Sequence, residues 1–131
     1  MPSRRPQGNT VVLAVLRSPA HRLLSRMTME LRYTGRRTGR QYVVPVQYAR
    51  DRERLVVVPQ GAGSKTWWRN FLTAQPVTVR LDGRLRQGFA HVVDRQDPEW
   101  AQDRRLYEAR WRRSAGKVDG PIVEISLADE K

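Results

Sequence analysis

The chain has 131 residues, a length typical of one domain with a single hydrophobic core. It carries 25 Lys and Arg against 13 Asp and Glu, a formal net charge of +12, and all but three of the basic residues are arginine. Because the planar guanidinium binds phosphate and carboxylate groups, this charge indicates an anionic partner. The absence of cysteine excludes disulfides and thiolate catalysis, and no apolar run approaches the ~18 residues of a membrane span.

The beginning of the sequence is polar and contains two prolines. We therefore expect a disordered tail over residues 1–8, followed by a single domain over residues 9–131. The apolar segment VVLAVL after this tail is too short for a secretory signal. We expect a cytoplasmic protein.

The first third of the chain predicts two short helices and a strand. Asn9 or Thr10 is a candidate N-cap for a helix through VVLAVLR. Pro19 is well placed to begin a second helix, which ends near residue 27. Residues 28–33 alternate between apolar and polar side chains, which is typical of a half-buried strand.

The middle of the chain predicts two more strands and a helix. Residues 41–49 form a strand in which Pro45 indicates an edge or a bulge, and residues 54–58 form the next. A glycine loop follows, with Ser64 as the candidate N-cap of a helix over residues 65–74. The dipeptide Gln75-Pro76 ends this helix.

The last third predicts a hairpin, a helix and a final strand. Strands over residues 77–81 and 85–93 flank Asp-Gly, a strong signal for a two-residue hairpin. Asp97 and the proline after it open a helix that runs to about residue 114. Its aromatic residues are spaced for one face, and residues 122–127 alternate as a strand.

Six short and mostly antiparallel strands with flanking helices predict an α+β fold. A barrel is the favoured arrangement, because closure leaves no exposed edge strands. The sequence shows neither internal repeats nor low-complexity tracts.

Familiar catalytic patterns are missing from this sequence. His21 and His91 are far apart and belong to no metal-binding motif, and the acidic residues are scattered. We therefore predict no metal site. An enzyme without a nucleophile, a metal or a general-base cluster usually takes its chemistry from an organic cofactor.

The turn TGRRTGR, at residues 34–40, is a candidate anion site. Its glycines allow a close approach of the backbone, and consecutive N–H groups can form an anion-binding nest. The arginines add charge-assisted hydrogen bonds. An ordinary basic hairpin loop has the same spacing, so the turn alone leaves both interpretations open.

The segment GAGSKTWWRN, at residues 61–70, combines a glycine loop with a helix start. Glycines let a planar ring lie against the backbone, and free N–H groups at a helix start bind oxygen atoms. Trp67 and Trp68 are adjacent, so they point about 100° apart on a helix. One can pack in the core while the other flanks a pocket, and both can equally be structural.

These features in this order resemble the deazaflavin-dependent nitroreductase family, also called coenzyme F-420-dependent quinone reductases. The resemblance is strong over residues 31–81. The matching features are TGRRTG, the strand with Pro45, the strand at 55–58, the glycine loop, the cluster Trp67, Trp68 and Asn70, and the break before VTVRL. This family implies a split β-barrel and hydride transfer from the reduced deazaflavin to an electron-poor acceptor such as a quinone, a nitroaromatic or an enone.

The resemblance also implies site residues. Contacts to the phosphate and the polyglutamate tail of coenzyme F-420 fall on Arg36, Arg37, Thr38 and Arg40. Contacts to the ring fall on Pro59, Gln60, Gly61, Ala62, Lys65, Trp67 and Asn70. Tyr107 or Tyr33, or solvent, supplies a proton. The loop departs from the family at Pro59, whose missing N–H excludes a backbone donor there.

Other interpretations remain open at this stage. A split-barrel flavoprotein using FMN would share the fold, and a carrier would bind the deazaflavin without turnover. A small basic nucleic-acid-binding barrel fits the charge and the tryptophans, although the aromatic residues gather at one helix start and not along the strand faces. We predict a small-molecule acceptor, no nucleic acid partner, and a homodimer.

Overall fold

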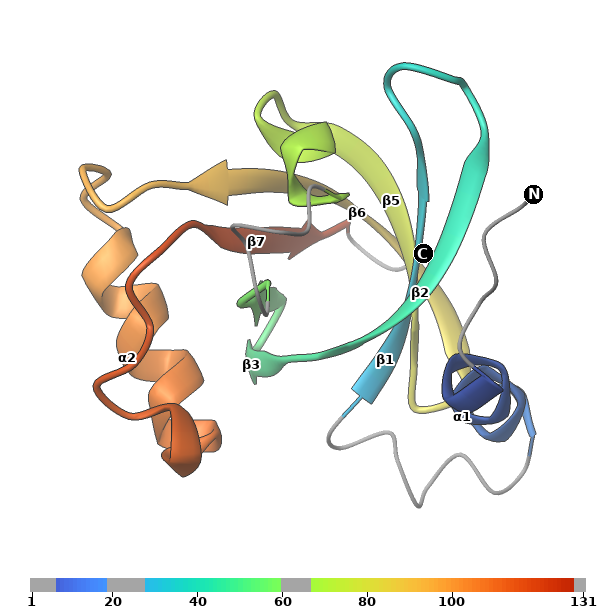
Figure 1. Ribbon diagram of the computed structural model, residues 1–131, viewed down its shortest axis with the longest axis horizontal. Coiled ribbons are helices and arrows are strands. Elements are labelled where there is room, and N and C mark those ends of the chain that lie inside the picture. The colour runs from blue at the N-terminus through green and yellow to red at the C-terminus, as the bar shows by residue number, and fades with distance from the viewer. Residues whose placement is uncertain (1–6, 19–27, 60–66, 129–131) are drawn as a thin grey trace.

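The computed structural model of the chain describes residues 7–18, 28–59 and 67–128. Two α-helices, α1 (Gln7–Arg17) and α2 (Trp100–Arg110), flank a curled sheet, and two short 3-10 helices, η2 (Trp67–Phe71) and η3 (Arg112–Ser114), lie between strands (Figure 1). No helix in these ranges is both long and apolar enough to cross a bilayer. The second predicted helix, over residues 19–27, lies outside the described residues.

Seven strands form the sheet in the described part of the chain, and every pairing between them is antiparallel. Their order across the sheet is β2-β1-β5-β6-β7-β4-β3. The strands are β1 (Thr28–Thr34), β2 (Gln41–Gln47), β3 (Ala49–Asp51), β4 (Arg54–Val57), β5 (Gln75–Leu81), β6 (Arg84–Val93) and β7 (Ile122–Leu127).

The covalent chain requires this sheet to curl. Strands β2 and β3 lie at opposite edges of the sheet, yet only Tyr48 separates them in sequence. The two edges must therefore approach each other, which gives the half-closed barrel that Figure 1 shows. The expected α+β split barrel is confirmed, with seven antiparallel strands because the predicted strand at 41–49 breaks at Tyr48.

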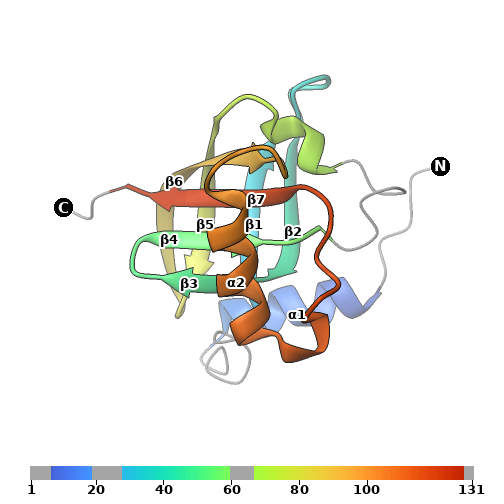
Figure 2. The same ribbon diagram turned by 90° about the vertical axis from the view of Figure 1, so that its left-hand side faces the viewer.

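Both faces of the sheet are buried at strands β4 and β7. Inside the curl, Leu31, Val79 and Ile125 belong to a core of aliphatic and aromatic side chains. On the outer face, α2 packs across β3, β4 and β7 (Figure 2), and Tyr107 there is 1% exposed. Neighbouring side chains on β4 and β7 consequently point into two different cores, and β7 is buried along most of its length.

The aromatic face predicted for the last helix is confirmed. Trp100, Tyr107 and Trp111 all pack in the cluster beneath α2. The Trp100 indole N–H donates to the carbonyl of Gly120 at 3.0 Å, and the Trp111 indole N–H donates to the carbonyl of Tyr48 at 3.0 Å. The first bond ties the start of α2 to the segment before β7, and the second ties its end to Tyr48, which links β2 to β3.

A buried carboxylate attaches α1 to the sheet. Glu30 is fully buried on the outer face of β1 and contacts arginines from three elements, Arg17, Arg32 and Arg80. Burial alone would raise the pKa of Glu30, but hydrogen bonds from Arg17 and Arg32, together with their charges, outweigh it and hold its pKa below the ordinary value. The sequence predicted a half-buried strand here because its pattern does not reveal that a helix covers the second face.

Several predicted boundaries shift. The helix expected over residues 65–74 is a 3-10 helix over Trp67–Phe71, and Gln75 and Pro76 already belong to β5. The last helix begins at Trp100, and Asp97 instead closes the preceding turn by accepting from the N–H of Asp94 at 2.8 Å. The two-residue hairpin between β5 and β6 is confirmed, with both of its residues at positive φ. The division into a tail and one domain stays a prediction.

Candidate functional site

The basic turn between β1 and β2 is held closed by its own backbone. The N–H of Gly35 donates to the carbonyl of Arg40 at 2.7 Å, and the N–H of Gly39 donates to the carbonyl of Gly35 at 2.9 Å. Gly39 has φ of +72°, a left-handed conformation that favours glycine. The N–H of Arg40 donates to Thr38 Oγ1 at 3.2 Å. The turn is therefore a defined structure that projects its arginine side chains outward.

Asn70 connects this turn to η2. The N–H of Arg36 donates to Asn70 Oδ1 at 2.8 Å, and Asn70 Nδ2 donates to the carbonyl of Trp67 at 2.8 Å. Both halves of the Asn70 amide are thus occupied by protein partners. Asn70 fixes the distance between the basic turn and the tryptophan helix, although the two are 34 residues apart in sequence.

Aromatic side chains form one wall of the site. The rings of Tyr33 and Tyr42 stack with centroids 5.4 Å apart, and Trp67 lies 6.3 Å from Tyr33. Phe71 closes the group from below, 5.4 Å from Tyr33 in an edge contact. Burial, with a smaller contribution from Tyr42, raises the pKa of the Tyr33 phenol, so this hydroxyl stays protonated at neutral pH.

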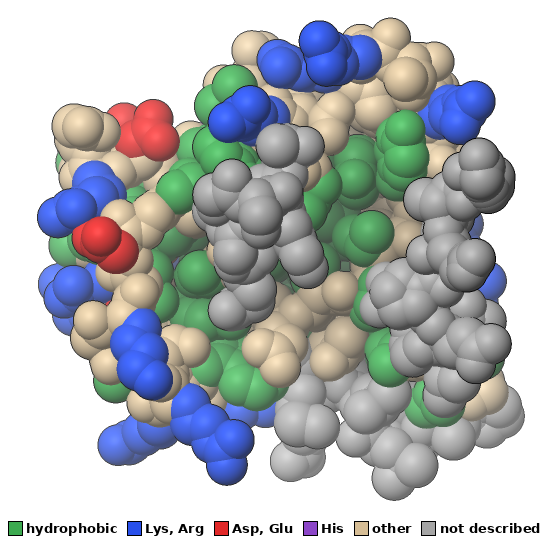
Figure 3. All heavy atoms as spheres, in the orientation of Figure 1, with side chains coloured by type: hydrophobic (Ala, Val, Ile, Leu, Met, Phe, Trp, Pro, Cys, Tyr) green, Lys and Arg blue, Asp and Glu red, His purple; other side chains and the backbone are tan. Residues whose placement is uncertain are grey.

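The turn, the aromatic wall and η2 enclose an open cavity of about 470 Å³. Figure 3 shows Lys and Arg side chains gathered at the top of the view, where Figure 1 places the β1–β2 turn, above a hollow with hydrophobic side chains. The cavity is lined by Tyr33, Gly35, Arg36, Arg37, Thr38, Tyr42, Trp67, Arg69 and Asn70.

The arginines of the turn carry charges that no nearby carboxylate in the described part of the chain compensates. Arg36, Arg37 and Arg40 make no ion pair with any residue in the described ranges, whereas three arginines converge on Glu30. None of the described residues that line the cavity carries a carboxylate either. Such uncompensated cations bind phosphate and carboxylate groups by charge-assisted hydrogen bonds.

A second, smaller cavity of about 190 Å³ adjoins the first through Trp67, which lines both. Most of its lining residues are apolar or aromatic types and include Val57, Pro59 and Tyr107. Pro59 and Trp67 are the residues on either side of segment 60–66, so both described ends of the predicted glycine loop meet at this cavity. The site thus has a cationic part and an apolar part with one tryptophan between them.

The structure brings most of the predicted site residues together. Arg36, Arg37, Thr38, Trp67 and Asn70 line the large cavity with Tyr33, and Pro59 and Tyr107 line the small one. Arg40 belongs to the turn but does not line either cavity. The predicted contacts at Gln60, Gly61, Ala62 and Lys65 lie outside the described residues.

Besides Gly35 of the basic turn, two residues of the cavity wall were not predicted as site residues, Tyr42 and Arg69. Tyr42 pairs with Tyr33 across the hairpin, where Thr34 opposes Gln41. Counting back from the glycine-bracketed turn would have placed the two tyrosines opposite each other. Arg69 is one basic residue among many in the sequence. The predicted α-helix would also direct its side chain differently from the 3-10 helix that the structure has.

Comparisons with known proteins agree with this geometry. A family model named "F420H(2)-dependent quinone reductase" matches residues 16–126. One solved structure, named a domain-swapped dimer, has a TM-score of 0.67 at 15% identity, covering 89% of this chain and 93% of that chain. Another, an "F420-H2 Dependent Reductase (FDR-A)", has a TM-score of 0.63 at 16% identity, covering 79% and 96%.

A third solved structure with the same fold is the FAD and heme binding protein from Mycobacterium smegmatis. It has a TM-score of 0.54 at 14% identity and covers 88% of this chain and 69% of that chain. At these identities the three structures establish the fold alone. No curated protein matches the chain.

The curled sheet and its cationic, aromatic cavity define a split-barrel protein of the kind that binds flavin-like cofactors. The family match spans most of the sequence, and the chain belongs to the F420H(2)-dependent quinone reductase family. It is an oxidoreductase whose cofactor is coenzyme F-420, and this family membership favours the deazaflavin over FMN. The residues present fit that cofactor. Arginines without an ion pair in the described ranges can bind its anionic tail, and the aromatic and apolar side chains beside them can contact its flat ring.

Proposed function

We propose that this protein reduces quinones and similar electron-poor acceptors, and that its two cavities divide the cofactor between them. The cationic cavity holds the phosphate and the glutamate tail through Arg36 and Arg37, with Thr38 as a hydroxyl donor. The apolar cavity, walled by Pro59 and Tyr107, receives the ring end. The supporting observation is that Trp67 lines both cavities, which places the cationic and the apolar cavity next to each other.

Reduced coenzyme F-420 supplies the hydride when it is bound. The protein's own residues orient the reactants and exclude water. The Trp67 indole offers a flat surface for stacking, and Asn70 keeps the cationic turn at a fixed distance from it. Reduction of a quinone to a quinol consumes one hydride and one proton. We assign the proton to the Tyr107 hydroxyl, because Tyr107 lines the cavity proposed for the ring.

A steady-state assay tests the division of roles. Reduced coenzyme F-420 is oxidised by menadione, and the recovery of the absorbance of the oxidised coenzyme is followed. The double variant Arg36→Ala/Arg37→Ala loses two phosphate contacts, each worth about 1 kcal/mol at an exposed site, so KM for the coenzyme rises about 30-fold. Because the ring end is unchanged, kcat stays within about threefold of the wild-type value.

A matched control separates a local site from general charge. Arg112 and Arg113 form another adjacent and exposed pair, in η3, without an ion pair in the described part of the chain. Arg112→Ala/Arg113→Ala removes the same two charges and leaves KM for the coenzyme unchanged. An equal rise of KM in both double variants would contradict a phosphate site at the basic turn, and coenzyme binding without turnover would identify a carrier.

We also propose that the protein forms a homodimer and resides in the cytoplasm. The outer face of β6 carries Leu85 and Phe89, which are 50% and 56% exposed. They border a hollow of about 570 Å³ on this face, and exposed apolar surface of this kind favours association. Sedimentation velocity of the wild type and of Phe89→Glu tests this, with a dimer expected for the first and a monomer for the second. A monomeric wild type would refute the dimer.

A further inference from the structure

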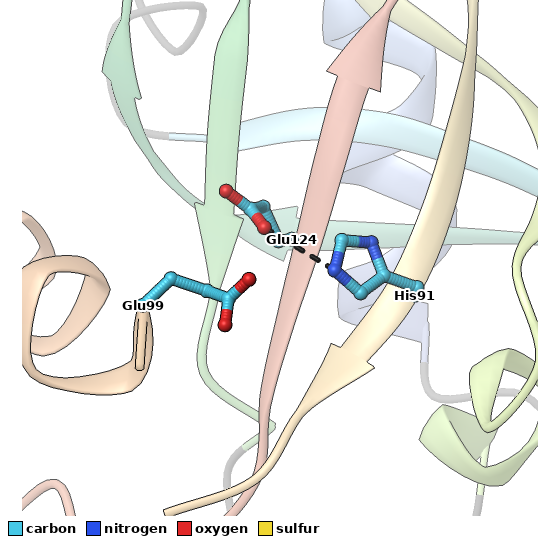
Figure 4. A group of neighbouring side chains, drawn as sticks. All are labelled: His91, Glu99 and Glu124. Atoms are coloured by element: carbon cyan, nitrogen blue, oxygen red, sulfur yellow. Dashed lines mark ion pairs between the residues drawn. The ribbon is translucent and has the colours of Figure 1, made fainter. Parts of the chain in front are cut away.

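Outside the cofactor site, three potential metal ligands meet on the face of the sheet that α2 covers. His91 lies on β6, Glu124 lies on β7, and Glu99 immediately precedes α2. Figure 4 shows the carboxylate of Glu99 and the imidazole of His91 both directed toward Glu124. One ligand atom from each residue lies within 4.8 Å of the other two. The linear sequence gives no sign of this group, because its members come from three separate elements.

The sheet itself holds two of these ligands in place. His91 and Glu124 are direct partners in the register between β6 and β7, and His91 Nε2 lies 3.3 Å from Glu124 Oε1. Two atoms bound to one Zn²⁺ at ~2.1 Å in a tetrahedron lie about 3.4 Å apart, so this pair already has the required separation. Glu99 is partly exposed, and one of its carboxylate oxygens lies within 4.8 Å of both of these ligand atoms.

The pairing of His91 with Glu124 does not compensate the other negative charges that surround Glu124. Asp103 is fully buried next to Glu124, and its Oδ2 has no hydrogen-bond partner among the described residues. Arg54 Nη1 lies 2.9 Å from Asp103 Oδ1 and 3.7 Å from Glu124 Oε2, so one guanidinium serves both carboxylates. Arg54 Nη2 also lies 3.5 Å from Asp51 Oδ2, so three carboxylates already share this guanidinium before Glu99, beside Glu124, is counted. Buried or crowded carboxylates of this kind are stabilised by a bound metal ion.

We propose that His91, Glu99 and Glu124 bind a divalent transition-metal ion of the zinc type. One imidazole and two carboxylates suit Zn²⁺, Mn²⁺ or Fe²⁺, and three protein ligands leave a position for water. Glu99 belongs to the start of α2, whereas the other two ligands belong to the sheet, so the ion would clamp α2 onto the barrel. Because Tyr107 lines the small cavity from α2, the clamp would also steady one wall of the cofactor site.

The test uses tag-free protein that has been treated with EDTA and dialysed into metal-free buffer at neutral pH. Calorimetric titration with Zn²⁺ is expected to give one equivalent bound with a micromolar or lower Kd. Titration with Co²⁺ as a spectroscopic substitute is expected to give the intense visible bands of a four- or five-coordinate ion. Saturating Zn²⁺ should raise Tm by about 5 °C or more, because the ion binds only the folded state.

Variants locate the site. His91→Ala is expected to weaken Zn²⁺ binding by about 100-fold, and Glu99→Gln by about tenfold, since a direct ligand matters at least as much as an outer-shell partner. His91 and Glu99 are both partly or fully exposed, so these variants are expected to fold, which circular dichroism checks. His21→Ala, which removes the only other histidine of the chain, is the matched control and should bind like the wild type.

Three results would overturn the proposal. The first is a Co²⁺ spectrum identical to that of the free hexaaqua ion. The second is equal Zn²⁺ affinity in the wild type and in folded His91→Ala. The third is loss of binding in His21→Ala, which would place the metal elsewhere. None of these readouts depends on coenzyme F-420, so the metal site and the proposed reductase mechanism can fail separately.

Discussion

A single methyl group on Gly35 should disturb the cofactor cavity without unfolding the barrel. A Cβ at this position would lie 2.7 Å from Tyr42 Cε2 and 3.2 Å from Thr38 Oγ1. Ordinary carbon–carbon contacts are roughly 3.5–4.0 Å, so the Tyr42 ring must move by about 1 Å in the Gly35→Ala variant. The stacked pair of Tyr42 with Tyr33, at 5.4 Å, is then lost or distorted.

The size of the effect follows from that contact. Loss of an aromatic pair destabilises the folded state by about 0.5–1.5 kcal/mol. Replacing glycine by alanine stabilises it by about 0.4–1 kcal/mol where the backbone tolerates alanine, because the unfolded chain then has less conformational entropy. The free energy of unfolding should therefore change by less than about 1 kcal/mol. Tyr42 forms part of the cavity wall, so we expect Kd for coenzyme F-420 to rise about 3- to 10-fold.

Fluorescence titration with the coenzyme, together with urea unfolding, measures both quantities. Gly120→Ala is the matched control, because a Cβ there meets no atom within 4 Å and Gly120 is not in the left-handed region. Unchanged coenzyme affinity in Gly35→Ala would show that Tyr42 is not part of the binding surface. A loss of stability well above 1 kcal/mol would show that the ring cannot move aside.

Two further predictions concern charge and proton transfer. Glu30→Gln should lower the free energy of unfolding by about 2 kcal/mol at neutral pH, because it removes the charge shared by the three arginines. The pKa of Glu30 is depressed in the folded state, so its contribution is complete above the ordinary value of 4.5 and is lost as the pH falls through the folded pKa. Urea unfolding curves of variant and wild type should therefore converge at acid pH, and a constant difference would contradict this. Tyr107→Phe should lower kcat about tenfold or more with little change in KM for the coenzyme, whereas Tyr33→Phe should act mainly on KM. Steady-state kinetics with menadione checks this, and the reverse pattern would assign the proton to Tyr33.

Local sequence patterns predicted the strands well. The alternation in residues 28–33, the Asp82-Gly83 hairpin and the aromatic face of α2 all depend on contacts between near neighbours. Pro45 also indicated correctly that its strand lies at an edge, because proline cannot donate to a ladder. In each case the residue types themselves carry the physical cause.

Other features depend on contacts that no local pattern contains. Glu30 is buried because α1 brings Arg17 across the outer face of β1, and the alternation of the strand alone places it in solvent. The break at Tyr48 follows from the closure of the sheet. His91 and Glu124 are adjacent only through the pairing of β6 with β7. Tertiary arrangement, and not propensity, decides these positions.

Sequence reasoning could propose the part of the candidate site that lies in one short loop, but not the parts that depend on distant elements. The glycine-bracketed turn indicated an anion site because its residue types bind anions in a short loop. Its attachment through Asn70 to η2, and the meeting of two cavities at Trp67, required the whole barrel.

The central claim is that the basic turn and the aromatic wall bind coenzyme F-420 in preference to FMN. The most direct measurement is a fluorescence titration of the purified protein with coenzyme F-420, with FMN in parallel, at moderate salt. We expect micromolar or tighter binding of the deazaflavin, FMN binding weaker by about tenfold or more, and a loss of deazaflavin affinity of about 30-fold in Arg36→Ala/Arg37→Ala. Equal or tighter binding of FMN would contradict it. Failure of both ligands to bind, with salt-sensitive binding of single-stranded nucleic acid, would point instead to a nucleic-acid-binding barrel.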